Sequence, residues 1–276
     1  MPWFPDFTSA MVLARQETRE AGQADPVRQY IAALNNGDIS ALETVWPGEV
    51  VIYDPRFGEV RGHRHLRHFV GVSQALLTER HARVDTVAET VCPGRAVVEL
   101  LAHLDGDGDR PEVLWPAAVV AESHDDRSVV FRSYFSRQPV DGERDHVRPA
   151  ILTSAADLPG DVVARFHAAL DAGDVDGVVS AFAPDGYYRE ASGPQATHRG
   201  PAELRAFFTT LFSGGGGIGL RPVAITDDGV RCAVEYNAVR WAGHDLPPQA
   251  GLCVLERGPD GLLAAVRQYD DLEPPA

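Results

Sequence analysis

The sequence is poor in the residues that build disulfide frameworks, metal sites and membrane spans. Only three cysteines occur among its 276 residues, scattered at Cys92, Cys232 and Cys253. They are too few and too widely spaced for a disulfide framework or a zinc site. No stretch approaches the roughly 18 apolar residues that a membrane span needs. The N-terminus also lacks the basic, apolar and small-residue order of a secretion signal. We therefore expect a cytoplasmic protein with no membrane partner.

Positive charge is scarce as well. The chain has 25 Lys and Arg residues against 40 Asp and Glu residues, which gives a formal net charge of −15. An acidic surface repels phosphate backbones, and no run of basic residues compensates, so nucleic acid is excluded as a partner. Hydrophobic residues (44 %) and charged residues (24 %) occur at the frequencies of globular proteins. At about 100–200 residues per domain, the length predicts two folded domains.

An internal repeat organises the chain. Residues 25–46 align without gaps within the segment 160–182, so that Gly37-Asp38 falls on Gly173-Asp174, an offset of 136 positions. Four further pairs of segments correspond in the same order: 50–55 with 186–191, 62–70 with 200–208 after a two-residue insertion, 95–103 with 231–239, and 129–135 with 264–270. The repeat predicts one domain over 24–138 and a second over 158–274. The segment 139–157 between them is polar and contains prolines, which is typical of a linker.

Each copy has the pattern of helices followed by strands. In the first copy, Val27, Ile31 and Leu34 recur at helical spacing, and further helices are predicted on 39–46 and around 62–70. Four strand-like runs follow, over 82–91, 95–104, 112–122 and 128–137. Three helices before an antiparallel sheet predict an α+β fold with helices layered on the sheet. The sheet must curl to bury the helices, and such a curl leaves a cavity.

These features, and VRQYIAALNNGDISALETVW (27–46) in particular, resemble the ketosteroid isomerase branch of the nuclear transport factor two-like superfamily, also called SnoaL-like. The resemblance covers both halves. It implies two cone-shaped α+β-barrel domains, each with three N-terminal helices packed on a curved, mostly antiparallel sheet around an apolar pocket. It also implies cofactor-free chemistry. Because dimers of the family pack sheet against sheet, it implies an intrachain pseudo-dimer and leaves a further homo-oligomer open.

The resemblance extends to candidate catalytic residues. The isomerase motif places a tyrosine in the first helix and a general-base aspartate in a strand-end Asp-Pro, 24 residues later. Tyr30 and Asp54 keep this spacing, whereas the second copy has Phe166 and Glu190 at the matching positions. The resemblance thus implies that Asp54 and Glu190 move a proton and that Tyr30 steadies an enolate. The residues alone leave an alternative, because an aspartate before proline commonly ends a strand in a turn.

The isomerase also uses a protonated aspartate on a later strand as a second oxyanion donor. That position falls near Ala118 in the first copy and near Leu252 in the second, and both residues are apolar. The standard oxyanion hole is therefore absent from both copies at that place.

Aromatic residues of the strands are the candidates for contact with a substrate. We predict that Trp115, Tyr134, Tyr188 and Tyr236 line the cavities. Asn237 beside Tyr236 is poorly suited to a strand centre and is predicted to add a polar group to the second cavity. Histidines and arginines alternate over 61–68, and the arginines would repel a cation, so we predict a solvated basic helix face and no metal site there.

Three functions remain open at this stage. The first is a cofactor-free acid/base enzyme of the isomerase, cyclase, dehydratase or epoxide-hydrolase type, acting on a small hydrophobic carbonyl or epoxide compound. The second is a non-catalytic protein that binds a small hydrophobic molecule, or a scaffold, with one or both pockets degenerate. The third has one active and one degenerate copy. Tyr30 favours the first copy as the active one, whereas the polar Tyr236-Asn237 segment favours the second.

Overall fold

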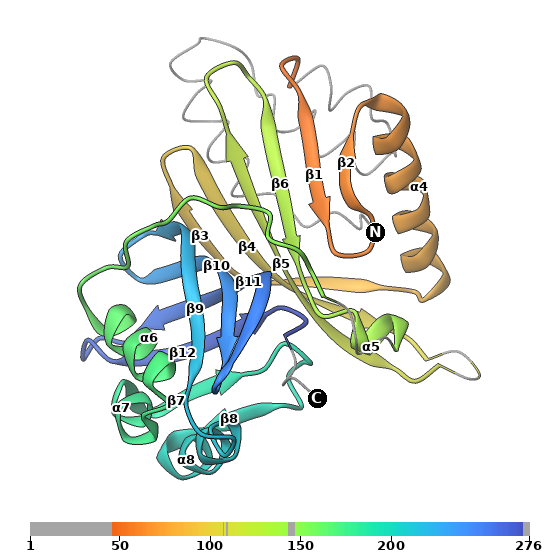
Figure 1. The fold of residues 1–276 in the computed structure, drawn as a ribbon. Helices are drawn as coiled ribbons and strands as arrows, with labels where there is room; N and C mark the ends of the chain where they lie inside the picture. The colour runs from red at the N-terminus through yellow and green to blue at the C-terminus, as the bar shows by residue number, and fades with distance from the viewer. Residues whose placement is uncertain (1–45, 107, 109, 143–146, 273–276) are drawn as a thin grey trace. The chain divides into compact units, whose positions relative to one another are not determined.

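The structure is a computed structural model and describes residues 46–106, 108, 110–142 and 147–272. The chain forms two compact units, Met1–Phe135 and Ser136–Ala276. Each contains a six-stranded mixed sheet with one parallel pair of strands, and its other pairs are antiparallel (Figure 1). In the described residues neither sheet closes into a barrel. Two α+β units of one topology confirm the predicted fold class and the tandem repeat.

The first unit has the strand order β2-β1-β6-β5-β4-β3. The helix α4 buries Leu66, Phe69 and Val70 in a core shared with the strands. The helices predicted on residues before Trp46 lie outside the described residues. The elements of this unit are β1 (Val50–Asp54), β2 (Gly58–Arg61), α4 (His63–Glu79), β3 (Arg83–Cys92), β4 (Arg95–Leu104), β5 (Val113–Ser123) and β6 (Val129–Tyr134).

The second unit repeats this topology, with the strand order β8-β7-β12-β11-β10-β9. Its three predicted helices are present, and Phe166, Leu204 and Phe208 of these helices belong to the same core as strand residues such as Val234. The elements are α5 (Gln138–Asp141), α6 (Val162–Ala172), α7 (Val175–Ser180), β7 (Phe182–Arg189), β8 (Thr197–Arg199), α8 (Gly200–Leu211), β9 (Ile218–Asp227), β10 (Arg231–Trp241), β11 (His244–Arg257) and β12 (Leu263–Tyr269).

Strand register makes the two copies comparable residue by residue. Glu99 pairs with Ala118 between β4 and β5, and the matched Glu235 pairs with Leu252 between β10 and β11. The parallel pairs agree in the same way, because Tyr53 lies opposite Arg132 in β1–β6, as Arg189 lies opposite Arg267 in β7–β12. A position of one copy can therefore be compared with its counterpart in the other.

The segment between the repeats packs on the second unit. Ala250 donates its backbone N–H to the carbonyl of Arg148 at 3.0 Å. The Asn237 side chain donates to the carbonyl of Leu152 at 2.8 Å. Ala156 donates its N–H to the carbonyl of Pro222 at 3.1 Å. The residues around 148–156 thus run along β9, β10 and β11, whereas the predicted domain limits and the pseudo-dimer stay predictions.

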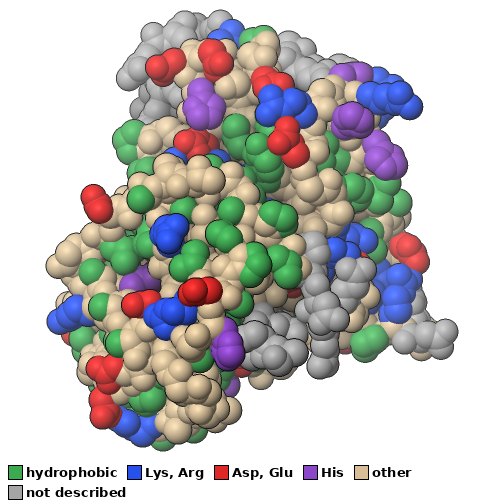
Figure 2. All heavy atoms as spheres, viewed as in Figure 1, with side chains coloured by type: hydrophobic (Ala, Val, Ile, Leu, Met, Phe, Trp, Pro, Cys, Tyr) green, Lys and Arg blue, Asp and Glu red, His purple; other side chains and the backbone are tan. Residues whose placement is uncertain are grey.

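The outward side of α4 is basic and rich in histidine. His63, His65 and His68 are exposed there together with Arg64 and Arg67. Figure 2 shows basic and histidine side chains gathered over this helix, at the upper right of the view. In the described part of the chain, no group of three His, Cys, Asp or Glu side chains is arranged to hold a metal ion. None of the described helices has the length and apolar character needed to cross a membrane.

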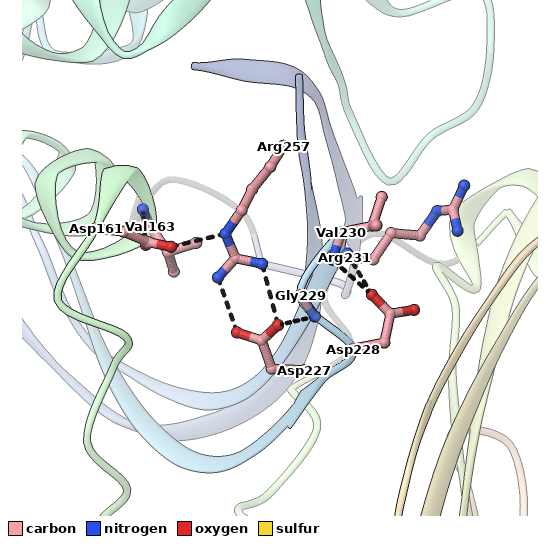
Figure 3. Close-up of polar contacts among 8 residues, drawn as sticks. All are labelled: Asp161, Val163, Asp227, Asp228, Gly229, Val230, Arg231 and Arg257. Atoms are coloured by element: carbon pink, nitrogen blue, oxygen red, sulfur yellow. Dashed lines mark hydrogen bonds and ion pairs between the residues drawn. The ribbon is translucent and has the colours of Figure 1, made fainter. Parts of the chain in front are cut away.

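An arginine bridges α6 to the sheet of the second unit (Figure 3). Asp161 caps α6 by accepting the N–H of Val163 at 2.8 Å, and its other oxygen lies 2.7 Å from Arg257 Nε. The other guanidinium nitrogens of Arg257 bind both oxygens of Asp227 at 3.0 and 2.8 Å. Burial acts to raise the pKa of Asp227, but hydrogen bonds from Arg257 and from the N–H of Gly229 outweigh it and lower that pKa.

Replacing this arginine is expected to destabilise the second unit. Arg257→Met leaves two carboxylates facing each other without their shared cation, and we expect a loss of about 2 kcal/mol in the free energy of unfolding. The matched control is Arg205→Met, because Arg205 and Asp176 form an ion pair at 2.6 Å whose side chains are 52 % and 83 % exposed. Such an exposed pair contributes about 0–1 kcal/mol. Urea unfolding followed by circular dichroism measures both, and equal losses would contradict the bridging role.

Candidate active site

The second unit encloses a cavity of about 320 Å³. Helices α6 and α8, the strands, and the two segments at residues 136–138 and 270–272 contribute its walls. One part of the lining is apolar, formed by Leu170, Phe207, Leu211, Ile218, Leu220, Trp241 and Leu272. The other part is polar, formed by Ser136, Gln138, Tyr188, Glu190, Ser192, Gln268, Asp270 and Asp271. A cavity with this division suits a small molecule that has an apolar body and a polar group.

A carboxylate and an imidazole form a pair on the polar side. Glu190 follows β7 and lines the cavity, and its Oε1 lies 2.8 Å from Nε2 of His198. His198 lies on β8 opposite Tyr188, and its ring stacks on Phe207 with centroids 4.1 Å apart. The stacking fixes the plane of the imidazole, so the hydrogen bond to Glu190 keeps its direction. A carboxylate beside an imidazole can accept a proton and pass it on.

A second carboxyl, that of Asp270, lies directly after β12 and also lines the cavity. Its Oδ1 accepts the N–H of Leu272 at 3.2 Å, and its Oδ2 accepts the side-chain amide of Gln268 at 2.9 Å. The hydroxyl of Tyr236 donates to the same Oδ2. Burial raises the pKa of Asp270, although these hydrogen bonds act against the rise. Asp270 therefore keeps its proton to a higher pH than an exposed aspartate does.

Tyr236 stands behind the cavity wall rather than in it. Its side chain is fully buried, and burial together with the neighbouring Asp270 raises the pKa of its hydroxyl. On the adjacent strand β11, Gly251 pairs opposite Tyr236, and a Cβ at position 251 would overlap the tyrosine ring. The ring can occupy this place because residue 251 has no side chain. Tyr236 thus fixes the position of Asp270 by a hydrogen bond from outside the cavity.

The residues predicted for the second cavity separate into three groups. Tyr188 and Glu190 line it. Tyr236 reaches it through Asp270. Asn237 lies on the opposite face of the sheet and donates to the carbonyl of Leu152, because successive residues of a strand point to opposite faces. Phe166, the counterpart of Tyr30, is buried and packs edge-on against Phe182.

In the first unit, the predicted base is part of a turn. Asp54 is buried, and its Oδ1 accepts the backbone N–H groups of Arg56 at 2.8 Å and Phe57 at 3.3 Å, in the hairpin between β1 and β2. Tyr30 lies outside the described residues. Trp115 is buried with its ring edge-on to Phe135 at 4.7 Å, and Tyr134 is buried in β6 opposite Ala118.

Among the residues that the structure describes, the polar network of the second unit has no counterpart in the first. Only the strand-end carboxylate recurs, as Asp54 and Glu190. The other members are matched by smaller or apolar residues: Tyr236 by Leu100, Gly251 by Ala117, Gln268 by Ser133, Asp270 by Phe135 and His198 by Val60. His198, Gln268 and Asp270 were not among the residues predicted from the sequence. Their difference from the matched residues of the other copy is the signal that would have revealed them.

Comparison with known proteins places both halves in one family. The model of the SnoaL-like domain matches residues 27–132 and 163–268. No curated protein matches the chain. A similar solved structure is that of a putative polyketide cyclase from Sinorhizobium meliloti, with 22 % identity, a TM-score of 0.33, and coverage of 41 % of this chain and 95 % of that one. A protein with a ketosteroid isomerase-like fold from Catenulispora acidiphila, in complex with trimethylamine, has 18 % identity, a TM-score of 0.34, and coverage of 41 % of this chain and 86 % of that one. TerC co-crystallised with polyporic acid has 18 % identity, a TM-score of 0.34, and coverage of 40 % of this chain and 88 % of that one.

Proposed function

The chain belongs to the SnoaL-like domain family, with one copy of the domain in each half, and on this basis we propose that the second copy is a cofactor-free acid/base active site. Its substrate is a small hydrophobic carbonyl or epoxide compound. The observation that carries the proposal is the placement of two carboxyl groups on the polar side of one cavity. Glu190 is paired with His198, whereas Asp270 is held by Tyr236 and Gln268.

The two carboxyl groups have environments suited to opposite roles. The Glu190 side chain is 39 % exposed, and its neighbour His198 can take up the proton that it receives. Asp270 is buried, and its raised pKa makes it the better hydrogen-bond donor. Glu190 thus removes a proton from a carbon beside the carbonyl, and the electron pair of the broken C–H bond moves toward the oxygen. The carboxyl of Asp270 stabilises the negative charge that develops there.

The first copy takes no part in this chemistry in the proposal. Asp54 is engaged by two backbone N–H groups, and Leu100 and Phe135 occupy the positions of Tyr236 and Asp270. A site without the acid partner is a weak catalyst. Binding without turnover is the second candidate function of the protein. It is favoured by Ala118 and Leu252, which are buried and apolar at the positions of the isomerase's second acid.

Single substitutions in each copy test this proposal. With hydrophobic enones and epoxides as substrates, Glu190→Gln is expected to lower kcat about 100-fold or more, the usual contribution of a general base. Asp270→Asn is expected to lower it similarly, and Asp54→Asn to leave kcat within about twofold, because the turn around Asp54 accepts an amide oxygen equally well. A loss on Asp54→Asn in place of Glu190→Gln would assign the activity to the first copy. Ligands that bind unchanged to all variants without product would establish the binding function.

A further inference from the structure

The charge of the cavity lining points to a class of ligand. Three carboxyl groups, those of Glu190, Asp270 and Asp271, line the cavity, and no Lys, Arg or His is among its lining residues. Asp270 is the one that keeps its proton, so a ligand carboxylate or phosphate would be repelled by Glu190 and Asp271 and would find no cation in the lining to pair with. Within the walls that the structure describes, an anionic ligand is unfavourable.

Three arginines adjacent in sequence to lining residues contact other groups. Arg137 lies between the lining residues Ser136 and Gln138, but its Nε is 3.1 Å from Asp141. Arg240 precedes the lining residue Trp241, and its guanidinium binds Asp171 at 2.7 Å and the carbonyl of Ala242 at 2.9 Å. Arg189 lies between the lining residues Tyr188 and Glu190, and its guanidinium lies 4.6 Å from the centre of the Tyr269 ring and donates to the carbonyl of Gln268 at 3.3 Å. Each of these three arginines thus has partners of its own.

Aromatic rings add a second feature suited to a cation. Tyr188 and Trp241 line the cavity, whereas Phe207, which also lines it, has its ring stacked against Tyr188 at 5.2 Å and against His198 at 4.1 Å. The face of an aromatic ring carries partial negative charge and attracts ammonium groups, most strongly where water is excluded. The aromatic rings and the carboxylates thus both favour a positively charged ligand. The net charge of −15 also attracts cations to the protein as a whole.

The first residues of the second unit, 136–138, fix part of this lining. Ser136 and Gln138 contribute directly to the wall, and the backbone N–H of Arg137 donates to Oδ1 of Asp271 at 2.8 Å. This bond ties the residues after β12 to the residues before α5, so the Asp271 carboxylate is held at the cavity. Asn at position 271 can accept the same hydrogen bond, which makes Asp271→Asn a change of charge with little change of shape.

We propose that this cavity selects hydrophobic compounds that carry a protonated amino group, and that Asp271 and Glu190 are specificity-determining residues for that group. The inference rests on the proposed function, since it concerns the same cavity, and it adds a charge class to the substrate. An amine ligand places its ammonium group against the carboxylates and the aromatic faces. Its apolar body then fills the part lined by Leu170, Ile218 and Leu220.

Three probes of one shape and different charge test the proposal: 2-naphthylmethylamine, which is protonated at pH 7, neutral 2-naphthylmethanol, and anionic 2-naphthoate. Isothermal titration calorimetry on the full chain measures their affinities. We expect the amine to bind about tenfold or more tightly than the alcohol, and the carboxylate to bind most weakly. Asp271→Asn and Glu190→Gln should each lower the preference for the amine over the alcohol severalfold. The matched control Asp185→Asn, at an exposed acid of β7 outside the lining, should not.

Each other outcome overturns the proposal: equal affinities for the three probes, tighter binding of 2-naphthoate, a preference that survives both cavity substitutions, or no binding of the amine. The probes contain no carbonyl that the site could enolise and no epoxide, so the test is independent of turnover. If the wild type prefers the amine but the Glu190→Gln variant turns over every substrate normally, only the proposed function is contradicted. If turnover requires Glu190 but the wild type binds the carboxylate probe most tightly, only this inference is contradicted.

Discussion

Gly251→Ala is expected to lower turnover by the second copy about 100-fold, the scale seen when a donor in an active site is lost. A Cβ at position 251 would overlap the ring of Tyr236, which is fully buried. Displacement of the ring withdraws the tyrosine hydroxyl from Asp270. Overpacking of this kind also costs about 1–3 kcal/mol of stability.

The matched control is Gly243→Ala in the hairpin between β10 and β11. A Cβ there meets no atom within 4 Å, and its backbone is not in the left-handed region that favours glycine. We expect turnover and thermal unfolding of this variant to match the wild type. A second measurement does not depend on a substrate: the pKa of Asp270, followed by carbon NMR of the carboxyl group, should rise in Gly251→Ala, because the Tyr236 hydrogen bond lowers it. An unchanged pKa and unchanged turnover would show that Tyr236 does not position Asp270.

The differences between the copies are physically coupled, which explains why they occur as a set. A tyrosine at position 236 needs a residue without a side chain opposite it and a group to receive its hydroxyl, and the second copy supplies Gly251 and Asp270. Leucine at the matched position 100 needs neither, so Ala117 and Phe135 are tolerated there. Conversion of one copy into the other therefore requires several simultaneous changes.

Much of the fold could be predicted from periodicity and self-similarity. The apolar, strand-like run over 95–104 marks a strand, and β4 spans Arg95–Leu104. The repeat, the helices of the second copy and the helix-before-sheet order were also predictable, because each depends on local patterns. Their correspondence across the offset of 136 positions is supported by the strand register of both sheets.

Only part of the site could be predicted, because the order of the strands in the sheet brings its residues together. Glu190 was predicted from the resemblance to the isomerase motif, whose helix-to-strand spacing of 24 residues it keeps, and it lines the cavity. Tyr236 and Asn237 were both predicted to face the cavity, but neighbours in a strand point to opposite faces, so only one of them could. Asp270 lies 34 residues beyond Tyr236. Their contact depends on β10, β11 and β12 being adjacent, which no local pattern reveals.

His167 is expected to make the second unit sensitive to mild acid. It lies on α6 and is 6 % exposed, with the Cys253 sulfur 3.9 Å from its Nε2. Burial lowers its pKa from 6.5 to about 4. The unfolded chain takes up a proton near pH 6.5, whereas the folded chain does so only near pH 4. The contribution of His167 to the free energy of unfolding is therefore present in full above pH 6.5, and it is lost as the pH drops toward 4. By linkage, the loss from this residue approaches about 3 kcal/mol.

The repeat itself suggests the substitution that tests this, because the first copy has Ile31 at the matched position. His167→Ile removes the titrating group and keeps an apolar side chain in the core. The free energy of unfolding that is lost between pH 7 and pH 5 is measured by urea titration. This loss should be smaller in His167→Ile than in the wild type, by most of the amount that His167 contributes. His244→Asn, at an exposed histidine of β11, should leave the loss unchanged. If His167→Ile and the wild type lost the same stability over this range, proton uptake by His167 would not drive the acid response. Other groups in the unit, Asp227 among them, have lowered pKa values and would weaken the fold only at lower pH.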